Sequence, residues 1–237
     1  MKKSITLILP AYNEKKTIGQ TILEAAAYFE SHNFQYEIIV SADGNDGTRE
    51  LAEEMGFNNP RIHVMGQVER HGKGYGIRQA VLAAQGDYIG FSDADNKTPI
   101  SEFDKIFPLL EQGFEMVIGS RAGREAVIER YQPWFRQIGS RGFGLLMHTV
   151  TGLWEFQDTQ CGFKFFQGFA ARNLFARQKI NGYMVDVEIL YLARLMKYKV
   201  AQVPVRWRDD GDSRLQLVRG NIQNVQDLFR IRFGGKN

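Results

Sequence analysis

The chain has 237 residues, of which 43% are hydrophobic and 24% charged, values that are ordinary for a soluble globular protein with one large domain. The formal net charge of +3 argues against a dedicated nucleic-acid-binding protein, in which we would expect a dense stripe of Lys and Arg on one face. The single cysteine, Cys161, excludes an internal disulfide and fits a reducing compartment. No window approaches the roughly 20 apolar residues of a transmembrane helix. We therefore expect a cytoplasmic protein without a membrane span.

Residues 1–120 alternate between strand-like and helix-like segments. The expected strands are residues 4–9, 37–41, 61–65, 87–92 and 114–119. The expected helices are residues 16–31, 46–55, 75–84 and 101–111. Gly56 is expected to stop the second of these helices. The alternation predicts an α/β fold with a mostly parallel central sheet flanked by helices.

After residue 120 the pattern changes. The charged, aperiodic segment 121–135 is expected to be a mobile loop, and no element is assigned between residues 167 and 183. The elements expected in this half are a glycine-containing helix at 137–154, a strand at 159–166, a helix at 184–197, a strand at 199–205 and an amphipathic helix at 215–233.

Three polar clusters, at residues 10–14, 43–46 and 93–95, directly follow expected strands. Parallel sheets bind ligands beyond the carboxyl ends of their strands, so we expect these clusters to converge there. In the last cluster, Asp93 and Asp95 lie one residue apart in an extended segment and point roughly the same way. Carboxylate pairs of this kind bind Mg²⁺ or Mn²⁺ together with substrate phosphates. A turn that caps the following helix is the other interpretation of this pair.

The first two clusters suit recognition of a nucleotide. Asp43 is assigned to the nucleobase or ribose, because a carboxylate accepts hydrogen bonds from N–H and hydroxyl groups. Pro10, Ala11 and Tyr12 are expected to form the floor beneath the base, with Glu14 reaching the ribose. A turn at the second cluster and a helix cap at the first remain the alternative.

Residues 70–76 are glycine-rich and basic and lead into a helix. They lack the glycine spacings of a P-loop and of a dinucleotide-binding fold. Lys73 is nevertheless expected to contact the donor, and a surface loop with solvated charges is the alternative.

Several motifs together support a family assignment. In the first half they are Leu-Pro-Ala-Tyr-Asn-Glu at 9–14, Ala-Asp-Gly-Asn-Asp-Gly-Thr at 42–48, Gly-Lys-Gly at 72–74, Asp-Ala-Asp at 93–95 and Gly-Ser-Arg at 119–121. In the second half they are Asp-Thr-Gln-Cys-Gly-Phe-Lys at 158–164, Val-Asp-Val-Glu-Ile-Leu at 185–190, Val-Pro-Val-Arg-Trp at 203–207 and Gly-Asp-Ser-Arg at 211–214. This pattern, which covers nearly the whole chain, resembles the inverting family 2 glycosyltransferases of the GT-A fold. Within them it is most similar to the dolichyl-phosphate glucosyltransferases, whose close relatives are the dolichyl-phosphate mannose synthases.

The resemblance implies a GT-A type nucleotide-binding sandwich that moves a hexose from a UDP-glucose or GDP-mannose type donor to a polyprenyl phosphate. It implies that Asp93 and Asp95 hold Mg²⁺ or Mn²⁺, with Ala94 between them in the donor site, and that Asp43 binds the base. We accordingly divide the chain into a nucleotide-sugar-binding half at 1–120, an acceptor-side half of the same domain at 121–214 and a C-terminal amphipathic helix at 215–237.

On the acceptor side, the resemblance places Arg121 and Arg214 near phosphates, and Asp158 and Lys164 at the acceptor wall. A phosphate acceptor is already anionic, so its attack needs no strong general base. Charge repulsion is the difficulty instead, at about 4 kcal/mol for two unit charges 4 Å apart at an effective dielectric constant of 20. The metal and the two guanidinium groups would screen it.

Two alternatives keep the donor site but change the outcome. With a hydroxyl acceptor on a glycan or protein, Asp186 or Glu188 would be the general base, unless both only stabilise a helix N-terminus. A non-catalytic nucleotide-sugar binder is the other, because Lys97 stands where mannose synthases often supply a metal-binding Gln. A sugar nucleotidyltransferase is disfavoured, since residues 10–14 are not the glycine-rich basic loop expected after its first strand.

Two further features depart from the family pattern. The usual Asp/Asn-Asp-Gly-Ser is shortened at residues 42–45, and the hydrophobic segment that some relatives append is missing. The tail helix has two interpretations: it packs on the domain, or it lies on the inner face of a membrane with its arginines near anionic headgroups. The expected location is therefore cytoplasmic, with peripheral membrane contact under the second interpretation.

Overall fold

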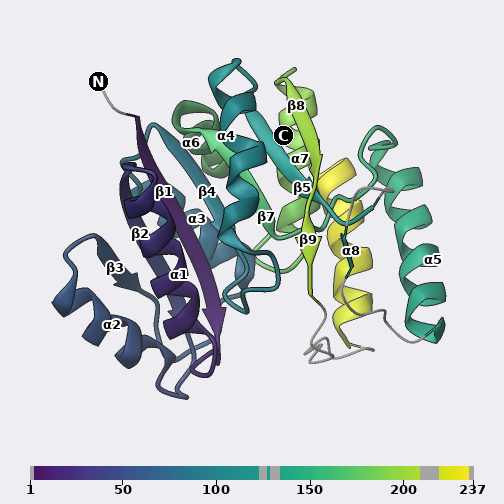
Figure 1. The fold of residues 1–237 in the computed structure, drawn as a ribbon. Helices are drawn as coiled ribbons and strands as arrows, with labels where there is room; N and C mark the ends of the chain where they lie inside the picture. The colour runs from purple at the N-terminus through teal and green to yellow at the C-terminus, as the bar shows by residue number, and fades with distance from the viewer. Residues whose placement is uncertain (1–2, 123–126, 129–133, 209–218, 235–237) are drawn as a thin grey trace.

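The structure, a computed structural model, describes residues 3–122, 127–128, 134–208 and 219–234, and for 127–128, 134–141 and 219–221 it describes the backbone alone. Over these residues the chain forms a central sheet with the strand order β3-β2-β1-β4-β7-β5-β8 (Figure 1). Its strands are β1 Ser4–Tyr12, β2 Gln35–Asp43, β3 Ile62–Met65, β4 Tyr88–Ser92, β5 Met116–Ser120, β7 Phe163–Gln167 and β8 Val200–Pro204. Strand β7 pairs antiparallel with β4 and β5, and the other neighbours are parallel. The expected α/β fold with a mostly parallel sheet is confirmed.

Helices cover both faces of this sheet (Figure 1). One face carries α1 Ile18–Ser31, α2 Thr48–Asn58 and α4 Phe103–Glu111, which follows the short 3₁₀ helix η1 Ile100–Glu102. The other face carries α3 Lys73–Ala83, α5 Trp134–Thr151, α6 Gly168–Arg177, α7 Val185–Leu195 and α8 Arg219–Phe233. A small parallel pair, β6 Val127–Ile128 and β9 Arg206–Trp207, lies outside the main sheet.

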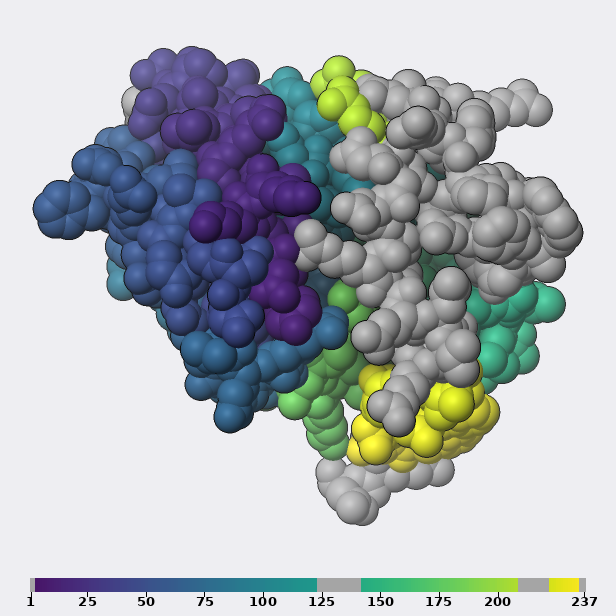
Figure 2. Space-filling view, turned by 90° about the horizontal axis from the view of Figure 1, so that it is seen from below, coloured from purple at the N-terminus to yellow at the C-terminus, as the bar shows by residue number. Residues whose placement is uncertain are grey.

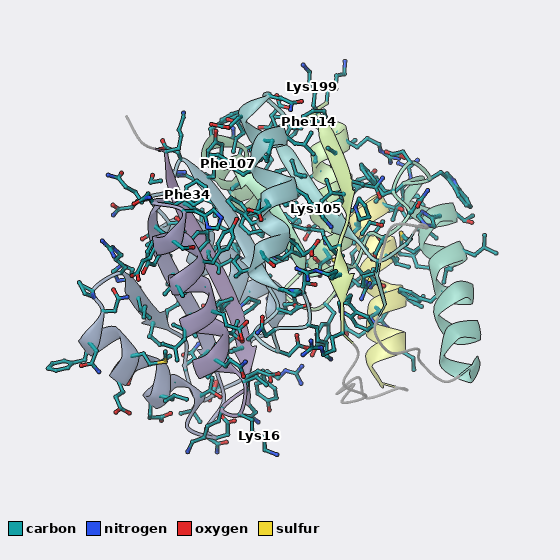
Figure 3. All side chains as sticks on the ribbon, in the orientation of Figure 1. Lys16, Phe34, Lys105, Phe107, Phe114 and Lys199 are labelled. Carbon is teal, nitrogen blue, oxygen red and sulfur yellow. The ribbon has the colours of Figure 1, made fainter. Side chains whose placement is uncertain are left out.

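The core has two layers because successive strand residues point to opposite faces. In β1, Leu7 and Leu9 pack toward α1 and α4, whereas Ile8 packs toward α3 and α7. Aromatic rings extend the first layer: Phe34 and Phe107 meet edge to face, with ring centroids 4.9 Å apart (Figure 3). The alternation of apolar residues in the sequence therefore becomes two helix-covered cores.

Several expectations about elements are corrected. Helix α2 continues through Gly56 to Asn58, so Gly56 is not the helix stop that was expected. A Cβ at Gly56 would lie 2.9 Å from the backbone oxygen of Ile62, so this glycine permits close packing of α2 on β3. Helix α6 fills a segment for which no element was expected. Strand β7 begins at Phe163, four residues after the expected start at 159.

The segment expected as a mobile loop, 121–135, falls mostly outside the described residues; its described part contains β6 and the start of α5. Helix α8 agrees with the expected tail helix from residue 219 onward, and its inner face buries Leu228 and Ile231. Across the described part of the chain, no helix combines the length and apolarity needed to cross a membrane.

Candidate active site

The carboxyl ends of the parallel strands bring the predicted polar clusters together. Tyr12 at the end of β1 pairs in register with Asp43 at the end of β2. The backbone N–H of Glu14 donates to the hydroxyl of Thr48 at 2.8 Å, which ties the first cluster to the start of α2. Figure 2 looks onto this edge, where the N-terminal part of the chain forms the surface coloured purple to blue. The expected convergence is therefore present.

The antiparallel strand β7 adds a second set of groups to the same edge. Because β7 runs opposite to its neighbours, the residues that precede it lie beside the carboxyl ends of β4 and β5. A Cβ on Gly162 would overlap the carboxylate of Asp93, so the Asp93 side chain lies directly against the Gly162 backbone. No role was predicted for Gly162, although it lies within the motif at 158–164.

Each carboxylate of the Asp-Ala-Asp motif has a lysine partner. Lys73 Nζ lies 2.9 Å from Asp93 Oδ1, and Lys97 Nζ lies 3.0 Å from Asp95 Oδ2. Burial raises the pKa of Asp95, the negative charge of Asp93 raises it further, and Lys97 offsets part of the shift. A cation placed beside Asp95 would stabilise the ionised form that these effects disfavour.

The motif fits a divalent metal in its donor chemistry. Mg²⁺ and Mn²⁺ take oxygen ligands and are often held by one or two carboxylates together with substrate phosphates. Among the described residues no cluster of three or more His, Cys, Asp or Glu could form a metal site from protein groups alone. Asp93 and Asp95 therefore suit a metal that shares its coordination sphere with a ligand, provided that Lys73 and Lys97 move aside.

Asp186 is buried near this motif and forms ion pairs with two lysines. Its Oδ1 accepts from Lys164 Nζ at 2.6 Å, and its Oδ2 accepts from Lys73 Nζ at 3.1 Å. Burial alone would raise the pKa of Asp186, but the two ammonium groups hold it below the usual range. Burial alone would lower the pKa of Lys73, but Asp186 and Asp93 hold it above the usual range. The motif resemblance predicted Lys164 at the acceptor wall; in the structure it lies in the buried run Phe-Lys-Phe-Phe of β7.

Arg121 follows β5 and is fixed by Asp158. Its Nε and a terminal nitrogen donate to the two oxygens of Asp158 at 2.7 and 2.9 Å, and its backbone N–H donates at 2.9 Å. The guanidinium carbon also lies 5.3 Å from the ring centre of Trp207. Burial opposes ionisation of both side chains, yet their mutual attraction raises the pKa of Arg121 and lowers that of Asp158. The same burial raises the pKa of the neighbouring Cys161 thiol to about 12, which keeps it neutral.

The nucleotide-side residues form a connected rim. Asp43 Oδ2 accepts from the backbone N–H of His71 at 2.8 Å. Arg70 lies 4.3 Å above the ring of Tyr12 and donates to the hydroxyl of Tyr183 at 3.0 Å, so it spans from β1 to the segment before α7.

The remaining predicted residues fall in three groups. Ala11 and Ala94 are buried, and the backbone oxygen of Ala94 accepts from the hydroxyl of Thr21 at 3.0 Å. Pro10 lies within β1, and Glu14 begins the turn into α1. Arg214 lies outside the described residues, so its predicted place near a phosphate stays a prediction.

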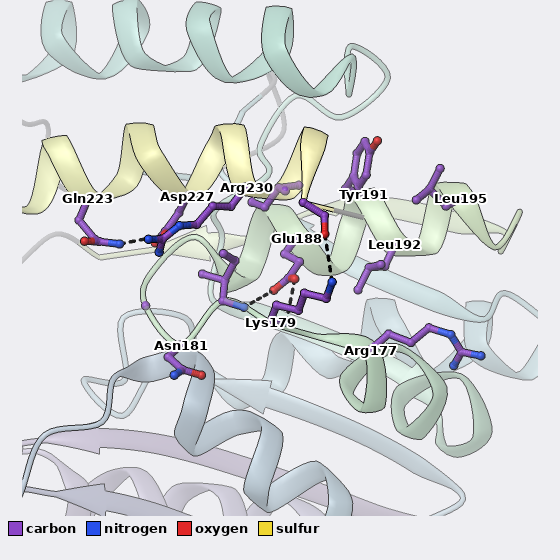
Figure 4. A pocket seen from close by; sticks show the side chains of 14 residues that line it. Arg177, Lys179, Asn181, Glu188, Tyr191, Leu192, Leu195, Gln223, Asp227 and Arg230 are labelled. Carbon is purple, nitrogen blue, oxygen red and sulfur yellow. Dashed lines mark hydrogen bonds and ion pairs between the residues drawn. The ribbon is translucent and has the colours of Figure 1, made fainter. Parts of the chain in front are cut away.

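Glu188 lies away from this site. Its carboxylate oxygens accept from the backbone N–H groups of Lys179 and Ile180, each at 2.8 Å. The side chain lines a hollow of about 650 Å³ between α7 and α8 (Figure 4). Asp93, Asp95, Lys73 and Asp186 are not among the residues that line it. Its observed role is to fix the turn before α7.

Comparison with known proteins agrees with this geometry. The sequence model "Glycosyl transferase family 2" matches residues 6–171. A dolichyl-phosphate beta-glucosyltransferase of Trichomonas vaginalis is 38% identical over 95% of this chain and 70% of its own length. Enzymes of the same name from Drosophila melanogaster and Homo sapiens are 34% and 32% identical, over 96% and 97% of this chain and 74% and 75% of their own lengths.

Solved structures share the fold. Glucosyl-3-phosphoglycerate synthase from Mycobacterium tuberculosis, in complex with UDP, superposes with a TM-score of 0.70 at 22% identity, covering 97% of this chain and 80% of that one. The same synthase in complex with Mn²⁺, UDP and phosphoglyceric acid gives a TM-score of 0.67 at 21% identity, covering 97% and 77%. These likenesses establish a GT-A type architecture. Because the family model covers most of the chain and relatives above 30% identity span nearly all of it, this protein is a member of glycosyl transferase family 2.

Proposed function

We propose that this protein transfers glucose from UDP-glucose to a polyprenyl phosphate. The observation that carries the proposal is the similarity to dolichyl-phosphate beta-glucosyltransferases, which extends over 95–97% of the chain and includes both halves of the site. We take the donor to be uridine-based because a solved neighbour of the same fold holds UDP.

The donor half of the site would be built from the strand ends. Asp43 and Tyr12 would bind the base and ribose, with Pro10, Ala11 and Glu14 beneath them. Asp93 and Asp95 would hold Mg²⁺ or Mn²⁺, as the Mn²⁺ and UDP in a neighbour's structure suggest. When bound, such a metal supplies positive charge that stabilises the leaving diphosphate. Lys73 would donate to the same diphosphate.

The acceptor half suits a phosphate rather than a hydroxyl. A hydroxyl acceptor needs a general base, and Asp186 is a poor one because it is 2% exposed and its pKa is lowered by two lysines. Arg121, held by Asp158 and Trp207, would present a fixed cation to the acceptor phosphate. Lys164 is fully buried, so its ammonium would not touch the acceptor directly.

We further propose that the enzyme works at a membrane surface, where a polyprenyl phosphate resides. Helix α8 packs against α5 and exposes Ile222, Phe229 and Phe233, which are 60%, 47% and 62% exposed. Large apolar side chains on an exposed helix face suit the headgroup boundary of a bilayer.

A substrate panel tests the proposed activity. Purified protein would be incubated with UDP- and GDP-sugars, Mg²⁺ or Mn²⁺, with and without dolichyl phosphate, and scored for released nucleotide and for lipid-linked sugar. We expect UDP-glucose with dolichyl phosphate to give the highest turnover. Transfer to a hydroxyl acceptor but not to dolichyl phosphate would contradict the proposal.

A further inference from the structure

Four side chains of alternating charge run from the core to the Asp-Ala-Asp motif: Lys164, Asp186, Lys73 and Asp93. The three links between them are 2.6, 3.1 and 2.9 Å long. Side-chain exposure rises along the series, from 0% through 3% and 14% to 46%. The buried end is therefore fixed, and the Asp93 end is open to a ligand.

The deep end is built by the antiparallel pairing of β7 with β4. Phe91 and Lys164 are partners in this ladder, so the Lys164 side chain enters the core beside a fully buried ring. Its ammonium also donates to the backbone oxygen of Cys161. The ammonium groups of Lys73 and Lys164 lie 5.7 and 5.8 Å from the centre of the Phe91 ring. Asp186 is thus held between two ammonium groups beside an apolar ring. Removing any one of these buried charges would destabilise the fold, because it leaves another charge without its partner.

Lys73 has one contact that a ligand could replace. Its bond to Asp186 is buried, whereas its bond to Asp93 is at the open end of the series. While Lys73 occupies Asp93 Oδ1, that oxygen carries a hydrogen bond that competes with a metal ion. A phosphate oxygen offers Lys73 a new anionic partner and would release Asp93 at the same time.

We propose that Asp186, anchored by Lys164, is a positioning residue that holds the Lys73 ammonium for the donor diphosphate. On donor binding, Lys73 keeps Asp186 and exchanges Asp93 for a phosphate oxygen, which frees the Asp93 carboxylate for the cation. Asp186 is then an anchor for a cation that the donor uses, and it takes no proton from the acceptor. The inference rests on the proposed function, because it assumes a nucleoside diphosphate in this site.

A double-mutant cycle with UDP as the probe tests this role. Calorimetry would measure UDP binding with and without Mn²⁺ for the wild type, K73M, D186N and the double variant K73M/D186N. We expect K73M to weaken UDP binding about tenfold to a hundredfold, and D186N to weaken it by a similar factor. The double variant should bind no more than about twofold more weakly than K73M, because both changes remove the same interaction.

Two further variants separate positioning from folding. K164M/D186N removes both charges of the buried pair and leaves neither unpaired, so it keeps the fold while Lys73 loses its anchor. It should bind UDP as weakly as K73M. E102Q is the matched control: Glu102 is also 2% exposed and is also held by two cations, Lys105 and Arg206, each at 2.6 Å. It should bind UDP as the wild type does.

The outcomes separate the inference from the proposed function. Fully additive effects of K73M and D186N, or normal UDP binding by K164M/D186N, would overturn the positioning role. Coupled effects in a protein that transfers no glucose to dolichyl phosphate would support the positioning role and refute the proposed acceptor. Steady-state kinetics provide a second test of the positioning role. K164M/D186N should raise the KM for UDP-glucose and leave the KM for the acceptor unchanged.

Discussion

Gly162 sets the position of the Asp93 carboxylate, the first of the Asp-Ala-Asp motif. A Cβ at Gly162 would overlap Asp93, so G162A must displace the Asp93 side chain or the β7 start. We expect G162A to lower the transfer rate at least about tenfold, since misplacement of a catalytic group by about 1 Å costs up to a hundredfold. G142A is the control, because nothing lies within 4 Å of a Cβ at that helix position. Equal rates for G162A and the wild type would show that the Asp93 position is unimportant.

The planar shape of the Arg121 guanidinium, and not its charge alone, should matter for activity. Its fork meets both oxygens of Asp158 and its face covers Trp207, and a lysine reproduces neither contact. We therefore expect R121K to raise the KM for polyprenyl phosphate about tenfold or more while the KM for UDP-glucose stays within twofold. Steady-state kinetics with each substrate varied in turn measures this. A change confined to the donor KM would place Arg121 on the wrong side of the site.

At the scale of elements, Glu102 fastens η1 to β9. Burial alone would raise its pKa, but hydrogen bonds from Lys105 and Arg206 hold the pKa below the usual range. A depressed carboxyl pKa contributes stability above the unfolded-state pKa, and this contribution disappears as the pH falls through the folded-state pKa. E102Q should therefore lower the free energy of unfolding by about 1–2 kcal/mol at pH 7, with partners that are half exposed.

The pH dependence is the check on this prediction. Urea unfolding at pH 7, 5 and 3 should show the difference between E102Q and the wild type shrinking below about pH 4.5, where the unfolded carboxyl takes up a proton while the folded carboxyl is still ionised. A difference that stayed constant down to pH 3 would mean that the two ion pairs do not stabilise the fold.

The sequence predicted elements well where one periodicity dominated. The alternation of apolar residues placed β1, β2, β4 and β5 within a few residues of their observed bounds. Helix α6 was missed, although Ala170, Ala171, Leu174 and Phe175 form its buried face. The direction of β7 was also beyond prediction, because strand direction depends on the path of the chain between strands and leaves no mark on the strand's own residues.

At the scale of the whole molecule, the sequence located the candidate site but not its pairings. Strand ends placed Asp43 and Asp93 at one edge because parallel strands share that edge. The bond between Lys73 and Asp186 joins residues 113 positions apart, so only the folded chain brings them together. The motif resemblance assigned Lys73 and Asp93 to the donor side and Lys164 to the acceptor side. In the structure these three residues are connected through Asp186 by ion pairs.

Membrane contact is tested on the intact fold. Removing residues 215–237 would expose the core that Leu228 and Ile231 cover, so surface substitutions are the better probe. We expect I222S/F229S/F233S to float less with liposomes that contain anionic lipid and dolichyl phosphate than the wild type does, because apolar area is lost. F57S is the control, since Phe57 is 92% exposed on α2. Equal flotation of all three proteins would remove α8 from the membrane account.

The most direct measurement concerns the acidic pair at the end of β4. Formation of glucosyl phosphoryl dolichol from UDP-glucose and dolichyl phosphate would be followed for the wild type, D93N and D95N over a range of Mn²⁺ concentrations. The account predicts a wild-type reaction that depends on Mn²⁺ and a loss of about a hundredfold or more in each variant, since groups that stabilise a leaving diphosphate contribute on this scale. Wild-type rates in both variants, or full activity in the presence of a chelator, would contradict it.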